Sequence, residues 1–211
     1  PTQQFSLYKF HLDTPPTRLS LACLTKVRPS RVIYQESTSK VLGDFLTFVQ
    51  QNPQYQAELE GIVEVFSKDN NGQVFEKIAD YYLSKGNKEL AFTFYQKGIE
   101  VDSDNFSLLK NTLLLQLEFN RFAAAKNLSA SSLEVFPAQP VLYLLNAMAN
   151  NNLQDFKAAI NALETGLDYL FDNAELEKEF YEQLAVAYTG IGNTIKAANF
   201  AIKAAEILDS N

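Results

Sequence analysis

GQVFEKIADYYLSKGNKELAFTFYQKGIEVDSDN, which spans residues 72–105, is the stretch that decides the fold. Apolar residues in its first half recur at the +3, +4 and +7 spacing of an amphipathic helix, at Phe75, Ile78, Ala79 and Tyr82. A second set continues the pattern after a break, at Ala91, Tyr95 and Gly98. The stretch therefore predicts two amphipathic helices in succession.

The break between the two sets has the residues of a tight helix–helix turn. Gly86 can adopt the left-handed conformation that ends a helix, and Asn87 can accept a hydrogen bond from an amide at the start of the next helix. Small residues such as Ala91 and Gly98 on the second helix allow two helix axes to approach closely. We therefore expect a helical hairpin over residues 72–105.

The same pattern recurs along the chain with a period of 34 residues. The alanines that mark the second helix stand 34, 34 and 38 residues apart, at Ala91, Ala125, Ala159 and Ala197. A turn residue precedes each of them by five positions, at Gly86, Asn120, Gln154 and Gly192. A period of this length is the mark of stacked helical repeats, none of which can bury its apolar face alone.

These residues resemble the tetratricopeptide family, and the resemblance implies an all-α, right-handed α–α superhelix whose first helices line the concave side. The ranges expected are an irregular segment 1–37, a degenerate hairpin 38–71, and hairpins 72–105, 106–139, 140–177 with about one extra helical turn, and 178–211. Hairpin 106–139 departs from the family at four places where apolar or small residues are usual: Thr112, Gln116, Ser129 and Ser132.

By the same resemblance, the function is that of a non-catalytic scaffold that binds a protein or peptide segment in the concave groove. The expected groove residues are Gln73, Glu76, Lys77, Asp80, Lys110, Asn111, Leu114, Leu117, Leu144, Leu145, Met148, Glu182 and Val186. Leucines and Met148 would make the centre of this groove apolar, which suits an amphipathic helix or an apolar peptide.

The best-known subset of the family grips a terminal carboxylate with lysine, asparagine and arginine side chains on successive first helices. Only Lys110 matches here, because Leu114, Leu145, Glu179 and Gln183 stand at the other positions. We therefore expect no carboxylate clamp in this chain.

Composition excludes several other classes of protein. Hydrophobic residues make up 46% and charged residues 20% of the 211, as in a folded protein, and no apolar run approaches the roughly 18 residues of a membrane span. The net charge of the whole chain is -7. Residues 1–40 alone have a net charge of +4, so residues 41–211 have a net charge of -11. Because nucleic-acid affinity depends on basic groups, an acidic body argues against a nucleic-acid partner.

The residues needed for catalysis or metal binding are scarce. The chain has one histidine, His11, and one cysteine, Cys23, so neither a histidine pair nor a cysteine cluster can form. Cys23 lies in an apolar run and is interpreted as a buried thiol. No glycine-rich phosphate loop or nucleophile elbow is present. We expect neither a cofactor nor an enzyme active site.

Two alternatives to a peptide-binding scaffold stay open. Apolar residues of the last helix would be exposed if nothing packed on them, and a second copy could pack there to form a homodimer, through Ile195, Ala198, Ile202 and Ala205. The array could also be the regulatory region of a larger protein, since the sequence begins at Pro1 and is expected to be a fragment. The resemblance is broadest to bacterial tetratricopeptide proteins of unassigned role, which leaves the compartment open between the cytoplasm and the periplasm or cell envelope, with any targeting segment removed.

Overall fold

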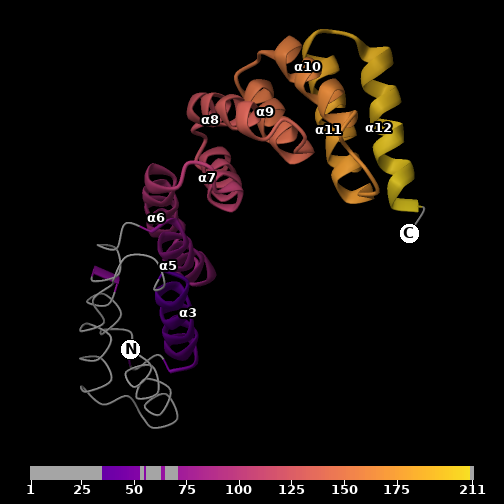
Figure 1. Cartoon of the computed structure of the whole chain (residues 1–211). Helices are drawn as coiled ribbons and strands as arrows, with labels where there is room; N and C mark the ends of the chain where they lie inside the picture. Colours follow the sequence, from indigo (N-terminus) through magenta and orange to yellow (C-terminus); the bar gives the residue numbers. More distant parts are fainter. Residues whose placement is uncertain (1–34, 53–54, 56–62, 65–70, 210–211) are drawn as a thin grey trace. The chain divides into compact units, whose positions relative to one another are not determined.

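The structure is a computed structural model that describes residues 35–52, 55, 63–64 and 71–209 (Figure 1). Over these residues every regular element is an α-helix, as the sequence predicts: α3 (Gln35–Gln51), α5 (Gly72–Ser84), α6 (Lys88–Val101), α7 (Phe106–Glu118), α8 (Phe122–Val135), α9 (Pro140–Asn152), α10 (Phe156–Leu167), α11 (Ala174–Gly190) and α12 (Thr194–Asp209). None of these helices is long and apolar enough to cross a membrane. Some predictions fall outside the described residues. They concern most of segment 1–37, including His11 and Cys23, and the second helix of hairpin 38–71.

Hairpin α5–α6 forms where the deciding stretch predicts it. The side chain of Asn71 caps α5 by accepting a hydrogen bond from the amide of Gln73 at 2.9 Å, and the Asn87 side chain caps α6 through the amide of Leu90 at 3.2 Å. Most apolar residues of the predicted spacing are buried, namely Phe75, Ile78, Ala79, Ala91, Tyr95 and Gly98, and Tyr82 is half-buried. The two faces of the hairpin therefore close on each other.

Each of the four predicted turn residues adopts the left-handed conformation. The φ angle is 75° at Gly86 and 76° at Gly192, where glycine permits it freely. It is also positive at Asn120 (56°) and Gln154 (61°), which carry side chains. The hairpin geometry thus imposes the same backbone turn on all four repeats.

Small residues on second helices permit close helix contacts. A Cβ atom added to Gly98 would lie 2.7 Å from a methyl carbon of Leu108, and one added to Gly166 would lie 2.6 Å from Cβ of Tyr143 and 2.7 Å from the ring of Phe180. Such separations are shorter than van der Waals contact. Gly166 therefore leaves no room for a side chain, whereas at Gly98 the neighbours are the terminal methyl groups of one leucine side chain.

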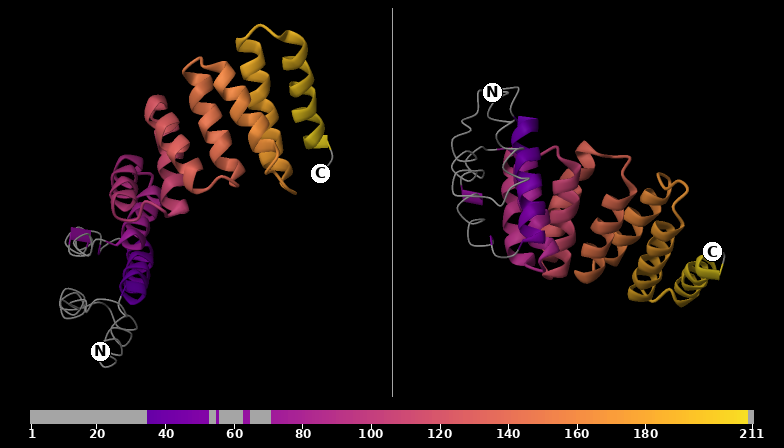
Figure 2. Two further views of the ribbon diagram at one scale, coloured as in Figure 1. Left: turned by 45° about the horizontal axis from the view of Figure 1, so that its top comes forward. Right: turned by 90° about the horizontal axis from the view of Figure 1, so that it is seen from below.

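The chain divides into two compact units, unit 1 up to Leu108 and unit 2 from Leu109, so that the boundary falls inside α7. In unit 2, successive helices from α8 to α12 pack side by side, and α9 also contacts α11 directly (Figure 2). The core of this unit is built from side chains of α9 to α11, including Leu144, Leu163, Phe180 and Leu184.

Polar residues are buried in the divergent hairpin α7–α8, where the family usually has apolar ones. The hydroxyl groups of Ser129 and Ser132 donate to backbone carbonyls of their own helix at 2.7 Å. Among the described atoms, the Thr112 hydroxyl and the Gln116 side-chain carbonyl find no hydrogen-bond partner. Unsatisfied buried polar groups cost free energy, and α9 carries two more of them, at the side-chain oxygens of Asn150 and Asn151.

The four extra residues before the last repeat lengthen both the connecting loop and the helix after it. The loop between α10 and α11 is residues 168–173, whereas the loops before α7 and α9 are the shorter segments 102–105 and 136–139. α11 begins at Ala174, capped by the Asn173 side chain through the amide of Leu176 at 3.0 Å. The extra turn expected in range 140–177 is therefore the first turn of α11.

Candidate functional site

The predicted groove residues lie on first helices of both units. Gln73, Glu76, Lys77 and Asp80 are on α5 of unit 1, while the remaining nine are on α7, α9 and α11 of unit 2. On α5, a carboxylate oxygen of Asp80 accepts a hydrogen bond from the Tyr95 hydroxyl at 2.6 Å. Asp80 therefore helps to hold hairpin α5–α6 together.

Two of the predicted groove residues are core residues. Leu144 and Leu145 are 1% and 2% exposed, so neither can meet a partner on an open surface. Both leucines lie on α9, which is in contact with α8, α10 and α11. Three neighbouring helices bury more of the circumference of α9 than the single partner helix of an isolated hairpin would. Leu144 packs in the cluster that contains Phe180 and Leu184.

The remaining apolar members in unit 2 stay accessible on three first helices. Leu114 on α7 and Val186 on α11 are 46% and 49% exposed. Lys110, Asn111 and Leu117 on α7 are half-buried, and Met148 on α9 is half-buried against the core cluster that contains Leu144. We call the six residues other than Leu144, together with Glu182, the first-helix surface. The amide of Asn151 on α9 donates to both the backbone and the side-chain oxygen of Gln183 on α11, at 3.1 and 2.9 Å, which fixes the spacing of these two helices.

The α11 part of this surface is acidic. Burial and the neighbouring carboxylates of Glu175 and Glu182 raise the pKa of Glu179, although Lys178 opposes them. Lys178 also forms an ion pair with Glu182 at 3.6 Å. A basic group of a partner would relieve this crowding of negative charge.

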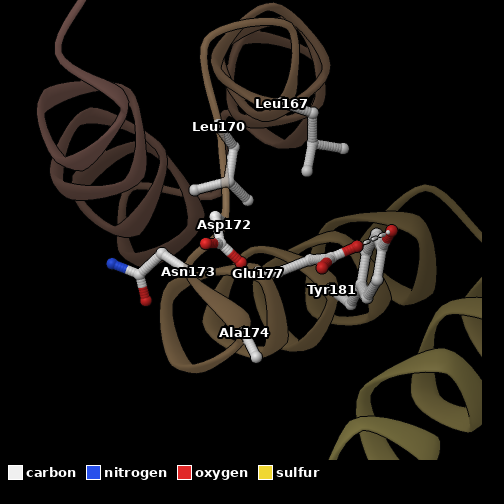
Figure 3. Close-up of a pocket in the computed structure, with 7 residues that line it drawn as sticks. All are labelled: Leu167, Leu170, Asp172, Asn173, Ala174, Glu177 and Tyr181. Atoms are coloured by element: carbon white, nitrogen blue, oxygen red, sulfur yellow. Dashed lines mark hydrogen bonds between the residues drawn. The ribbon is translucent and has the colours of Figure 1, made fainter.

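A hollow of about 320 Å³ lies beside the α10–α11 loop (Figure 3). Its apolar wall comes from Leu167, Leu170 and Ala174, and its polar wall from Asp172, Asn173, Glu177 and Tyr181. Sequence reasoning missed this site. The sequence does show that this repeat is four residues longer than the others. That difference in length does not indicate that the added residues enclose a space.

The two carboxylates of the hollow have different environments. Glu177 accepts a hydrogen bond from the Tyr181 hydroxyl at 2.6 Å, and this bond, together with burial and the negative charge of Glu177, raises the pKa of Tyr181 to about 12. Asp172 has a left-handed backbone (φ 48°) and, within the described ranges, makes no hydrogen bond or ion pair. Its carboxylate is available to a ligand.

The most exposed large apolar side chains among the described residues of unit 2 lie on the α10–α11 loop and on α12. Phe171, at the tip of the α10–α11 loop, is 91% exposed. On α12, Ile195 and Ile202 are 75% and 56% exposed, with Ala198 and Ala205 exposed on the same side. Large apolar groups on open surfaces often mark protein contacts.

The part of the chain that the structure describes contains no metal-binding cluster. No group of three or more histidine, cysteine, aspartate or glutamate side chains is arranged there to hold a metal ion. The surface features that remain are suited to binding, through apolar side chains and carboxylates.

Comparisons with known proteins agree with this fold. The family model described as Tetratricopeptide repeat matches residues 73–105. MamA from Desulfovibrio magneticus RS-1 (residues 41 to the end) superposes with a TM-score of 0.63 at 15% identity, over 81% of this chain and 97% of that one. MamA AMB-1 superposes with a TM-score of 0.62 at 16% identity, over 85% and 100%. A search of curated proteins found no match. At these identities the likeness shows the shared fold alone.

Proposed function

We propose that this chain, a tetratricopeptide repeat protein, is a non-catalytic scaffold that binds a segment of another protein. The observation that carries the proposal is the first-helix surface of unit 2, where Leu114 and Val186 are about half exposed. The family resemblance, in which first helices line the concave side, supports the same surface in binding.

The chemistry of this surface favours an amphipathic helical segment with one basic end. Apolar side chains at helical spacing would pack on Leu114, Leu117 and Met148. Basic side chains would meet Glu179 and Glu182 on α11, where negative charge is already crowded. A partner that presents a free carboxylate there would be repelled.

Paired affinity captures from a lysate of the source organism test the proposal. The test variant is Leu114→Glu/Val186→Glu, and the control is Leu153→Glu/Ile191→Glu, which adds the same charge at apolar residues of similar exposure (42% and 43%) in hairpin turns. A protein that the wild type and the control retain, and the test variant loses, is then purified. Its direct binding should weaken at least tenfold in the test variant, and identical capture by all three proteins would discard the proposal.

A second candidate function, self-association, is favoured by the outer side of α12. Ile195 and Ile202 are exposed and seven residues apart, as in the seam of a helical pair. On α10, 38 residues earlier, the same positions are occupied by exposed Lys157 and Glu164, so the apolar pair is particular to α12. Sedimentation should show a concentration-dependent dimer that Ile195→Glu/Ile202→Glu abolishes, and a monomer at all concentrations would remove this candidate.

A further inference from the structure

We propose that the hollow at the α10–α11 loop is a second contact point for a partner segment, and that it takes an arginine or lysine side chain while Phe171 packs against an apolar group beside it. The inference rests on the proposed scaffold function, because the basic group is taken to belong to a protein. It adds a site that lies apart from the first-helix surface and specifies what that site recognises.

The hollow exists because this repeat is longer than the others. Asp172, Asn173 and Ala174 belong to the longer loop and the added first turn of α11, and Glu177 ends that turn. Asp104 and Asn105 in the shorter loop 102–105 are the counterparts of Asp172 and Asn173, and Asn105 caps α7 through the amide of Leu108, so the added first turn of α11, from Ala174 to Glu177, is what the other repeats lack. The longer repeat therefore carries both the hollow and the exposed Phe171.

The residues around the hollow select the class of ligand. Asp172 and Glu177 supply negative charge, and the Asp172 carboxylate has no partner within the described residues. Leu167 and Leu170 supply an apolar wall (Figure 3). Lysine and arginine combine an apolar stem with a cationic head, and they bury the stem while the head meets a carboxylate. Two carboxylates are too few for a bare metal ion, which prefers a larger set of oxygen ligands.

Phe171 provides the second, independent indication of a partner. Its side chain is 91% exposed at the loop tip, directly before Asp172 in the chain. Aromatic side chains dominate the energy of many protein interfaces, often beside arginine. An exposed phenylalanine next to an unpaired carboxylate fits a segment in which basic and apolar residues alternate.

Glu177 in the hollow and Val186 in the first-helix surface lie on opposite sides of α11. Val186 follows Glu177 by nine residues, and at about 100° per residue this places it roughly 180° around the helix. A substitution at Val186 therefore does not alter the contacts of Glu177 directly. The two proposals can fail separately.

The test is a titration of the whole chain, followed by amide NMR, with N-acetyl-arginine N-methylamide and its lysine counterpart as probes. The neutral control ligand is the citrulline counterpart, which has nearly the same shape as the arginine probe. We expect saturable shifts at the amides of Asn173, Ala174 and Glu177, with a dissociation constant of about 1 mM as befits one side chain, and a loss of affinity at high salt.

Two double variants decide whether the hollow is the binding site. Asp172→Asn/Glu177→Gln should weaken the binding of the basic probe at least fivefold, since asparagine tolerates the left-handed backbone and glutamine can still accept from Tyr181. Asp168→Asn/Glu175→Gln removes the same charge from exposed residues outside the hollow and should change affinity less than twofold. Thermal unfolding of both variants confirms that they are folded.

Three results would overturn the inference. They are the absence of shifts with either basic probe, equal shifts with the citrulline ligand, and equal weakening in the two double variants. The same probe titrated into Leu114→Glu/Val186→Glu should bind as it does to the wild type. If it does, and that variant has lost its protein partner, the two sites are separate. If Leu114→Glu/Val186→Glu and the control variant Leu153→Glu/Ile191→Glu capture the same proteins while the basic probe still binds, only the proposed function of the first-helix surface fails.

Discussion

Replacing Gly166 with alanine is expected to destabilise unit 2, although alanine is the better helix former. The added Cβ atom would lie 2.6 Å from Cβ of Tyr143 and 2.7 and 2.9 Å from two ring carbons of Phe180. Carbon atoms in van der Waals contact are about 3.5–4.0 Å apart. The Phe180 ring is fully buried and the Tyr143 Cβ is fixed to its helix, so neither can move aside without shifting α9 or α11.

The expected loss is about 2 kcal/mol of the free energy of unfolding. Overpacking of a core costs about 1–3 kcal/mol, and the rigidity of both neighbours places this site at the upper end. Alanine returns about 1 kcal/mol through its higher helix propensity. For a chain of this length the net loss corresponds to a fall in Tm of about 4–8 °C.

Urea unfolding followed by circular dichroism measures this loss, with Gly43→Ala as the matched control. Gly43 also lies inside a helix, α3, but an added Cβ would have no heavy atom within 4 Å. The control variant should therefore be about 0.5–1 kcal/mol more stable than the wild type. If Gly166→Ala were stabilised as much as Gly43→Ala, the close packing of α10 between α9 and α11 would be refuted.

Three further predictions concern single sites. Leu145→Glu, which buries a charge at a residue 2% exposed, should cost more than about 4 kcal/mol or prevent folding, whereas Leu114→Glu should stay within about 0.5 kcal/mol of the wild type in the same urea assay. Glu177→Gln should lower the pKa of Tyr181 from about 12 toward its ordinary 10, as read from ultraviolet absorbance. The raised pKa of Tyr181 stabilises the folded wild type below pH 10, and this stabilisation is lost as the pH rises from 10 through 12. The variant should therefore lose less stability than the wild type over that interval. Asn87→Ala removes the cap of α6 and should cost about 1 kcal/mol, measurable as a lower urea midpoint, and an unchanged midpoint would show that the cap contributes nothing.

Local patterns in the sequence predicted the hairpins well, because they depend on neighbours close in the chain. The apolar spacing around Phe75 and Ile78 and the turn at Gly86 each act within one or two turns of helix. The 34-residue period also assigned Asn120 and Gln154 to the turns between helices. Both have a left-handed backbone there, which their residue types alone would not have indicated.

The surface was predicted less well, because exposure depends on elements distant in the chain. Leu144 and Leu145 have the spacing of surface residues on a single hairpin, yet α8, α10 and α11 together cover them. The hollow beside Asp172 was not predicted, because the 38-residue interval before Ala197 shows that residues were inserted and not what they enclose. Both cases require the packing of at least three helices.

Hydrogen exchange of the chain with and without a purified partner segment tests the central claim most directly. We expect the segment to slow exchange in α7, α9 and α11 around the first-helix surface. Leu114→Glu/Val186→Glu should remove this protection, and Leu153→Glu/Ile191→Glu should keep it. Protection confined to the second helices α8 and α10, or protection that survives in the Leu114→Glu/Val186→Glu variant, would contradict the account.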